Sequence, residues 1–89
     1  METWKWFVYI IECLDGTYYT GMTWSLSNRW DQHAAGNGSV YTKEHGFKAV
    51  VYSEEFEDLN DARAREIQIK KWSQNKKRKL IRGEWGKWE

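Results

Sequence analysis

A chain of 89 residues with seven tryptophans, five tyrosines, three phenylalanines and a net charge of +1 is too aromatic to be disordered and long enough for one modest core. Its single cysteine, Cys13, excludes an internal disulfide framework and a zinc site made of cysteines, and should be a buried strand residue. We find no secretory leader and no apolar run near about 18 residues, which predicts a cytoplasmic protein with no membrane partner.

The first predicted elements are two strands joined by a tight turn. Residues 5–12 and 17–23 each contain a β-branched and aromatic run, and the turn signal Asp15-Gly16 lies between them. In such an antiparallel pair, Tyr9 and Tyr19 should lie roughly across from each other. Two phenols on one sheet face are usually packing residues, and a reactive pair is the alternative.

The next predicted element is a short helix over residues 26–34. Ser25 is a plausible N-cap, and Gly36 follows the end of the helix. Arg29 and His33 are four residues apart and therefore share one face, at the edge of an apolar stripe. Either a solvated polar face with a satisfied histidine or a catalytic pair would fit this pattern.

The rest of the chain alternates loop, strand and helix. Residues 35–46 are predicted to be a glycine-rich loop, flexible enough to close over a ligand. A strand follows at residues 47–53. Two helices complete the prediction, at residues 61–73 with Asn60 as N-cap and near residues 75–81 with Asn75 as N-cap.

These elements predict the α+β class, with a small three-stranded antiparallel sheet flanked by two or three helices. Residues 1–82 should form one domain, and residues 83–89 a short tail. Trp85 and Trp88 in that tail could pack on the domain or stay exposed for a protein scaffold partner.

Glu66 is the clearest anomaly in the second predicted helix. It lies in a stripe of roughly 60° with Ala62 and Ile69, on the face expected to meet the sheet. An ionised carboxylate is costly to bury without a partner. An ion pair with Arg29 or Arg65 would be a structural explanation, and a metal site a functional one; the spacing allows both.

Five fragments, taken in order, resemble one known family. They are Tyr9, Tyr19-Thr20-Gly21, Arg29 with His33, Tyr41-Thr42-Lys43, and Arg65-Glu66 before Ile69-Lys70-Lys71. Over roughly residues 5–81 they resemble the catalytic domain of the GIY-YIG endonuclease superfamily, in particular its small stand-alone branch. The chain is also similar to the nuclease domain of structure-specific, partner-dependent repair nucleases and to the UvrC incision domain. Phe7-Val8-Tyr9 replaces the superfamily's Gly-Ile-Tyr.

The resemblance implies a metal-dependent endonuclease that hydrolyses DNA phosphodiester bonds, with a link to DNA repair or recombination. Glu66 would hold one weakly bound Mg²⁺ or Mn²⁺ ion. Tyr9 would act as the general base, with His33 positioning it or relaying its proton. Tyr19 would orient the water or the phosphate, and Arg29 would contact the scissile phosphate.

Substrate contacts are expected from a second group of residues: Gly21, Tyr41, Lys43, Lys70 and Lys71. Residues 1–69 contain six Lys and Arg against eleven Asp and Glu, whereas residues 70–89 contain eight against two. This basic stripe would attract a phosphate backbone and favour recognition of DNA shape over base sequence. A solvated helix end is the simpler interpretation of the same charges. A non-catalytic or partner-dependent nucleic-acid-binding module is the alternative function.

Overall fold

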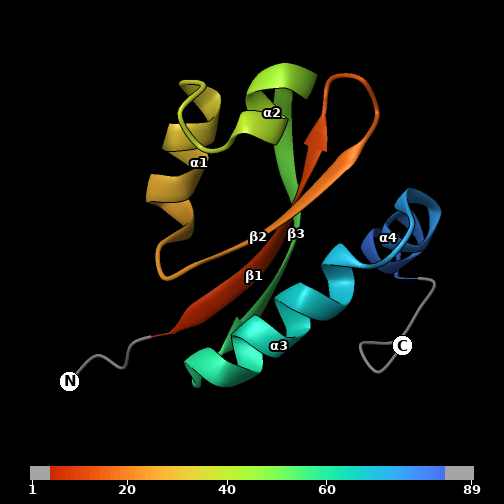
Figure 1. Cartoon of the computed structure of the whole chain (residues 1–89). Helices are drawn as coiled ribbons and strands as arrows, with labels where there is room; N and C mark the ends of the chain where they lie inside the picture. The colour runs from red at the N-terminus through yellow and green to blue at the C-terminus, as the bar shows by residue number, and fades with distance from the viewer. Residues whose placement is uncertain (1–4, 84–89) are drawn as a thin grey trace.

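The computed structural model describes residues 5–83. In chain order its elements are β1 (Trp6–Cys13), β2 (Tyr18–Thr23), α1 (Leu26–Ala34), α2 (Val40–His45), β3 (Phe47–Phe56), α3 (Leu59–Lys70) and α4 (Gln74–Ile81). The sheet lies between the pair α1 and α2 and the pair α3 and α4 (Figure 1). The predicted α+β class and the three-stranded antiparallel sheet are confirmed; within the described residues there are four helices, one more than the upper prediction.

Strand β1 is the centre of the molecule, because the strand order is β2-β1-β3 and both pairings are antiparallel. Its side chains alternate between two cores, as the period of a strand requires. Val8 and Ile10 are buried against α3 and α4. Tyr9, Ile11 and Cys13 are buried on the other face, against α1 and α2. The prediction that Cys13 is a buried strand residue is therefore confirmed.

The β1–β2 register differs from the predicted one. Tyr9 pairs with Gly21, and Tyr19 pairs with Ile11. The hairpin is centred on Asp15, whereas a direct pairing of Tyr9 with Tyr19 would need a centre at residue 14. This shift of one residue in the centre moves the β2 partner of every β1 residue by two positions. A shift of two keeps every side chain on its original face. Tyr9 and Tyr19 therefore share a face of the sheet as diagonal neighbours. The prediction that they lie directly across from each other is wrong.

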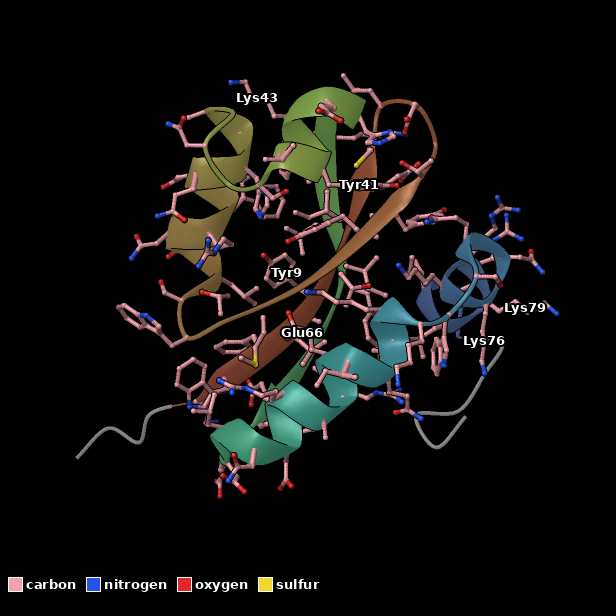
Figure 2. The ribbon with its side chains drawn as sticks, in the orientation of Figure 1. Tyr9, Tyr41, Lys43, Glu66, Lys76 and Lys79 are labelled. Atoms are coloured by element: carbon pink, nitrogen blue, oxygen red, sulfur yellow. The ribbon has the colours of Figure 1, made fainter. Side chains whose placement is uncertain are left out.

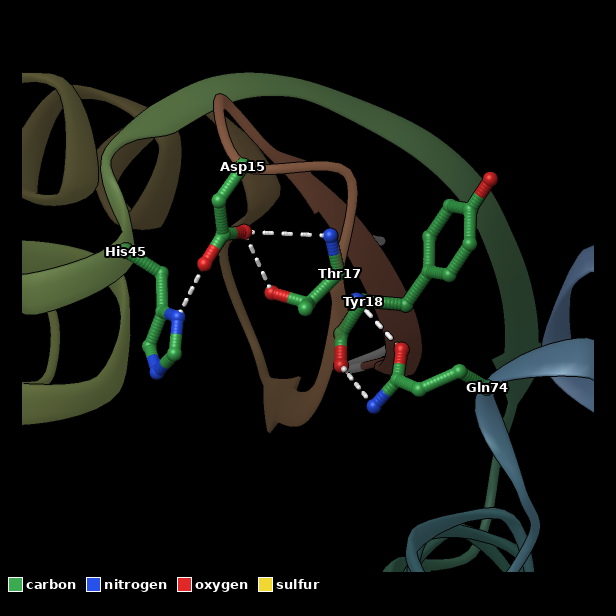
Figure 3. Close-up of polar contacts among 5 residues, drawn as sticks. All are labelled: Asp15, Thr17, Tyr18, His45 and Gln74. Atoms are coloured by element: carbon green, nitrogen blue, oxygen red, sulfur yellow. Dashed lines mark hydrogen bonds and ion pairs between the residues drawn. The ribbon is translucent and has the colours of Figure 1, made fainter.

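Asp15 joins the hairpin turn to α2 (Figure 3). Its Oδ1 atom accepts hydrogen bonds from the backbone nitrogen of Thr17 at 3.1 Å and from the Thr17 hydroxyl at 2.7 Å. Its Oδ2 atom is paired with Nδ1 of His45, the last residue of α2. The bond to His45, followed by those to Thr17, lowers the pKa of Asp15 to about 2. Gly16, with a φ of 86°, completes the turn.

We expect Asp15 to make folding stability sensitive to acid. A carboxyl group whose pKa is lowered by folding stabilises the protein above its ordinary pKa of 3.8, and that contribution is lost as the pH falls through the folded value of about 2. The urea midpoint of the wild type should therefore fall between about pH 4 and pH 2 by more than that of Asp15→Asn. Equal falls in the two proteins would show that Asp15 does not carry this effect.

Helix α2 occupies part of the segment that was predicted to be a flexible loop, so the prediction is wrong for residues 40–45. Ser39 caps the helix: its side chain accepts a hydrogen bond from the backbone nitrogen of Thr42 at 3.1 Å. Gly46, with a φ of 85°, ends it. A helix of six residues is too short to show a hydrophobic period. With glycines on either side of it, the segment therefore resembled a loop in the sequence.

The bounds of α3 and α4 also differ from the prediction. Asp58, and not Asn60, caps α3 by accepting a hydrogen bond from the Asn60 backbone nitrogen at 3.2 Å. The helix ends at Lys70 instead of continuing to residue 73. Ser73, and not Asn75, caps α4. Two good capping residues lie close together at each site, and the backbone uses the earlier one.

Gln74 ties the start of α4 to the start of β2 (Figure 3). Its side-chain oxygen accepts a hydrogen bond from the Tyr18 backbone nitrogen at 2.6 Å, and its side-chain nitrogen donates to the Tyr18 carbonyl at 3.3 Å. The amide side chain thus pairs with an edge strand as another strand would. This contact fixes the basic C-terminal helix against the sheet.

A buried ion pair links α3 to β3. The Nε atom of Arg65 donates to Glu54 Oε1 at 3.1 Å, and an outer guanidinium nitrogen donates to Oε2 at 3.0 Å. The two residues are only 8% and 6% exposed. The suggestion that Arg65 could pair with Glu66 is therefore wrong, because the Arg65 side chain pairs with Glu54 instead.

Removing one member of the buried pair should be costly. Glu54→Gln leaves the Arg65 cation buried without a counter-charge, so we expect a loss of about 3 kcal/mol in the free energy of unfolding. Glu55→Gln is the matched control, because Glu55 pairs with Lys5 at 3.2 Å on the exposed surface, where a loss below about 1 kcal/mol is expected. Denaturant unfolding measures both variants. Equal losses would show that the buried pair has no special role.

No helix within residues 5–83 is long and apolar enough to cross a membrane. Trp85 and Trp88, together with the predicted tail from residue 84 onward, lie outside the described residues.

Candidate active site

Four elements supply the five predicted catalytic side chains, and Figure 2 shows two of them, Tyr9 of β1 and Glu66 of α3, in the middle of the molecule. Tyr9 lies in β1 and is hydrogen-bonded to His33 of α1. The charges of Arg29 in α1, Tyr19 in β2 and Glu66 in α3 all act on the Tyr9 hydroxyl and alter its pKa. Tyr9 and Tyr19 are thus both next to His33, and Arg29 and Glu66 are near enough for their charges to act on Tyr9, although the five residues are spread over 58 positions of the sequence, from residue 9 to residue 66.

Tyr9 is a buried phenol. The residue is 3% exposed, and its hydroxyl oxygen lies 3.1 Å from Nε2 of His33. Burial is the main cause that raises its pKa well above the ordinary value; the neighbouring Tyr19 also raises it, Arg29 opposes the rise, and Glu66 adds to it. Tyr9 is therefore a neutral phenol in the free protein, and ionises only if positive charge is added nearby.

His33 is buried, whereas the sequence predicted a position at the edge of the helix face. It is 2% exposed, and its ring stacks on Phe47 with the two ring centres 6.2 Å apart. Burial, followed by the charge of Arg29, lowers its pKa, so the imidazole is neutral. Its second ring nitrogen, Nδ1, lies 2.8 Å from the Thr42 hydroxyl. Both ring nitrogens are thus engaged.

Two glycines give these rings the space they occupy. A Cβ atom at Gly21 would lie 2.3 Å from the Tyr9 hydroxyl oxygen, so the phenol lies directly over the backbone of its cross-strand partner. A Cβ atom at Gly38 would lie 2.1 Å from Nδ1 of His33. Contacts this short do not occur with a real side chain. The glycine of the Tyr19-Thr20-Gly21 fragment is therefore needed to fit Tyr9, a role that the sequence did not indicate.

A row of stacked rings extends from the site to the hairpin turn. Tyr19 lies 5.8 Å from the His33 ring and stacks on Tyr41, with ring centres 5.6 Å apart. Tyr41 in turn stacks on His45 at 4.1 Å. Because His45 is bound to Asp15, this row holds α2 beside the active tyrosines. Tyr41, a predicted substrate contact, is therefore part of the support of the site.

Arg29 supplies the positive charge of the site. Its charge lowers the pKa of both Tyr9 and His33, so it favours phenolate over phenol and neutral imidazole over imidazolium. Its Nε atom is buried and has no hydrogen-bond partner among residues 5–83. The residue as a whole is only partly buried, and a guanidinium has terminal N–H donors besides Nε that suit it to contact a phosphate oxygen.

Glu66 pairs with neither of the arginines proposed for it. Its carboxylate lies 3.2 Å from the Lys70 ammonium, one helical turn away, and 16% of its side chain is exposed. Lys70 is therefore a partner of Glu66. Its half-exposed side chain makes the pair weak, so a stronger ligand could displace the ammonium from the carboxylate.

The donor set around Glu66 fits one weakly held divalent ion. Within residues 5–83 no group of three or more His, Cys, Asp or Glu side chains could enclose a metal. A Mg²⁺ ion is commonly held by one or two carboxylates, with water and substrate phosphate oxygens completing its shell. One partly exposed carboxylate matches that pattern, and does not match a closed structural site.

The remaining basic candidates lie away from Tyr9. Figure 2 shows Lys43 on the outer side of α2 and Lys76 and Lys79 on α4, all at some distance from Tyr9 and Glu66. Lys77 of the predicted basic stripe is buried, which lowers its pKa. The stripe is therefore interrupted, and Lys43 is not brought into the cluster. Lys71 is exposed at the end of α3.

Sequence reasoning missed the residues that hold His33 in place. Thr42 and Ser39 form its hydrogen-bonded support, and Gly38 packs against its ring. Ser39, three residues before Thr42, could have indicated the capped start of a helix at this point in the sequence. The contact between α1 and α2 that brings this start to His33 has no such signal.

Known proteins are similar to this chain in sequence and in fold. Residues 5–79 match the GIY-YIG catalytic domain. A UPF0213 protein of Desulfotalea psychrophila is 40% identical over 86% of this chain and 71% of its own length. A UPF0213 protein of Halobacterium salinarum is 41% identical over 83% of this chain and 96% of its own. The solution NMR structure of a UPF0213 protein from Bacillus halodurans has a TM-score of 0.55 and 37% identity, covering 86% of this chain and 82% of that one.

The structural match supports the same fold in the relative from Bacillus halodurans, and the domain match includes all five clustered side chains. Tyr9, Tyr19, Arg29, His33 and Glu66 thus all lie within the part of the chain that matches a nuclease-type catalytic domain. The chain belongs to the GIY-YIG family, and within it to the small UPF0213 proteins.

Proposed function

We propose that this protein is a divalent-metal-dependent endonuclease that hydrolyses DNA phosphodiester bonds. The observation that carries the proposal is the buried hydrogen bond between Tyr9 and His33, set beside the cation of Arg29. A phenol in contact with a neutral imidazole has an acceptor for its proton; the arginine favours the phenolate that results and opposes the imidazolium, so the transfer needs the added charge of the bound substrate and metal. Membership of a nuclease-type family supports this chemistry.

Tyr9 is the general base in this proposal. The phenol O–H bond breaks and its proton passes to Nε2 of His33, giving phenolate and imidazolium. The phenolate then removes a proton from the attacking water, the new hydroxide forms a bond to phosphorus, and one P–O bond of the backbone breaks. The leaving oxygen takes a proton from solvent, and the imidazolium of His33 returns its proton to solvent. Burial disfavours both charged rings, so the transfer does not occur in the free protein.

Arg29 and Tyr19 act on the substrate. Arg29 is only partly buried, and the terminal nitrogens of its guanidinium, not the buried Nε atom, would donate to a phosphate oxygen, the acceptor that a guanidinium binds best. This contact neutralises charge as the five-coordinate phosphorus forms. Tyr19, whose ring lies 5.8 Å from that of His33, orients the water or the phosphate through its hydroxyl.

Glu66 would hold one Mg²⁺ or Mn²⁺ ion, with water and phosphate oxygens as the other ligands. Such an ion would polarise the phosphate and stabilise the leaving oxygen. The Glu66 carboxylate must exchange Lys70 for the ion, which frees the ammonium to contact the DNA backbone. The protein would therefore bind the metal weakly on its own and more tightly with DNA.

The DNA would be recognised through its backbone and shape. The exposed basic side chains of α3 and α4 supply non-specific phosphate contacts, and no separate base-reading element is present in residues 5–83. A cytoplasmic role in DNA repair or recombination, with or without a protein scaffold, is part of this proposal.

Cleavage of end-labelled flap, splayed-arm and plain duplex DNA tests the function. With Mg²⁺ or Mn²⁺ the wild type should cut at least one of them, and removal of the metal by EDTA should stop cleavage. Glu66→Gln should reduce the rate by about 100-fold or more. Glu44→Gln, which alters an exposed glutamate of α2, is the matched control and should cut as the wild type does.

If metal makes no difference, or if both glutamine variants cut equally, the metal role of Glu66 is wrong. If the wild type binds DNA and cuts none of the three shapes, a binding module or a partner-dependent subunit becomes the better description.

A further inference from the structure

The hydrogen bonds of His33 continue beyond Tyr9 into the start of α2. His33 Nδ1 lies 2.8 Å from the Thr42 hydroxyl oxygen, which lies 2.9 Å from the hydroxyl of Ser39. Thr42 and His33 are each 2% exposed. A buried chain of three contacts thus connects the phenol of Tyr9 to the cap of a helix. Ser39 is fixed at the far end by accepting the Thr42 backbone hydrogen at 3.1 Å.

The number of hydrogen atoms available to this series of hydrogen bonds determines which group donates in each of them. A neutral imidazole has one N–H group, on either Nδ1 or Nε2. Among residues 5–83 the Tyr9 hydroxyl has no hydrogen-bond partner except Nε2 of His33. A buried O–H group left without an acceptor is costly, and a phenol is a strong donor to a bare ring nitrogen. The phenol therefore donates to Nε2, and the single imidazole hydrogen lies on Nδ1.

Thr42 is placed to receive that hydrogen. With hydrogen on Nδ1, the ring donates to the Thr42 oxygen, and the Thr42 hydroxyl donates onward to the Ser39 hydroxyl or to its carbonyl oxygen, which lies 3.4 Å away. Every group in the chain is then satisfied. A Cβ atom at Gly38 would lie 2.1 Å from the same nitrogen, so glycine at that position leaves Nδ1 free to contact Thr42.

We propose that Thr42 is a positioning residue that fixes the tautomer of His33, so that a bare Nε2 faces the Tyr9 hydroxyl. This inference rests on the proposed function, in which His33 accepts the phenolic proton. Transfer breaks the Tyr9 O–H bond and forms an N–H bond at Nε2. With the other tautomer, Nε2 already carries a hydrogen and cannot accept a second one. Thr42 contributes without touching the DNA.

The tautomer can be observed by NMR without any nuclease assay. Long-range ¹H–¹⁵N spectra of histidine-labelled protein at about pH 8, where imidazole is neutral, distinguish a protonated ring nitrogen from a bare one. The chain contains two histidines, and His45→Gln identifies the signals of His33. The wild type should show hydrogen on Nδ1. Thr42→Val, of similar shape but without the hydroxyl, leaves a hydrogen on Nδ1 without an acceptor and should move hydrogen to Nε2 in a measurable fraction of the molecules, and Thr42→Ser should restore the wild-type pattern.

Cleavage kinetics test the consequence. Thr42→Val should lower kcat by about 10- to 100-fold, the range found when support of an active histidine is lost, with KM unchanged, and Thr42→Ser should recover most of the rate. A wild-type His33 with hydrogen on Nε2, or an unchanged tautomer in a folded Thr42→Val, would overturn the proposal. An altered tautomer with unchanged kcat would overturn its catalytic part. Because the NMR result is independent of cleavage, a protein that cuts no DNA would refute the proposed function and leave the tautomer assignment to stand or fall by the spectra.

Discussion

Tyr9→Phe should lower the rate of DNA cleavage by a factor of about 10² to 10⁴, the usual contribution of a general base. The substitution removes one oxygen and keeps the ring, so the packing of β1 against α1 and α2 is preserved. It also leaves Nε2 of His33 without its partner, which should cost about 1 kcal/mol of stability. Single-turnover cleavage and denaturant unfolding measure the two effects separately.

The control for Tyr9→Phe is Tyr52→Phe. Tyr52 lies in β3, where its hydroxyl contacts Glu54 on the other side of the sheet from His33. Its loss should change stability, through the buried pair of Glu54, and leave the cleavage rate per folded molecule unchanged. If both tyrosine variants retain the wild-type rate, Tyr9 is a packing residue and the base is another group.

Gly21→Ala should disable the site as strongly as removal of Tyr9. A methyl group at this position would lie 2.3 Å from the Tyr9 oxygen and 2.5 Å from the ring carbon that bears it, so the phenol must move. Overpacking of this kind costs about 1 to 3 kcal/mol. A displacement near 1 Å at a reacting group lowers the rate by about 100-fold. We therefore expect loss of cleavage in a protein that still folds.

Thr20→Val is the matched control for Gly21→Ala. Thr20 is buried next to Gly21 on the opposite face of β2, and its hydroxyl has no hydrogen-bond partner within residues 5–83. Replacing that hydroxyl with a methyl group should leave the protein at least as stable and equally active. A Gly21→Ala protein with the wild-type rate would contradict the fit between Gly21 and Tyr9.

The strands and the longer helices could be predicted because their patterns are local. The β-branched run around Tyr9 and the turn at Asp15-Gly16 predicted the hairpin, and the capped segment after residue 25 predicted α1 with its bounds. Register could not be predicted, since it depends on the centre of the turn. Helix α2 was missed because six residues between glycines show no period.

The site was predicted unevenly for a related reason. Its members came from the family resemblance, which preserves residue types and order but gives no contacts. The structure adds Glu66 with Lys70, Arg65 with Glu54, and His33 with Thr42. Each of the last two pairs joins two different elements, so the distance between its members in the sequence does not follow the period of a helix or a strand. Only the fold places the partners beside one another.

The most direct test is to measure DNA binding and DNA cleavage on the same labelled flap substrate, with Mn²⁺ present, for the wild type and for Tyr9→Phe combined with Glu66→Gln. We expect both proteins to bind the DNA, because the basic side chains of α3 and α4 are unchanged, and only the wild type to cut it. Binding by both without cleavage by either, or cleavage by both at one rate, would contradict the assignment of Tyr9 and Glu66 as the residues that perform hydrolysis.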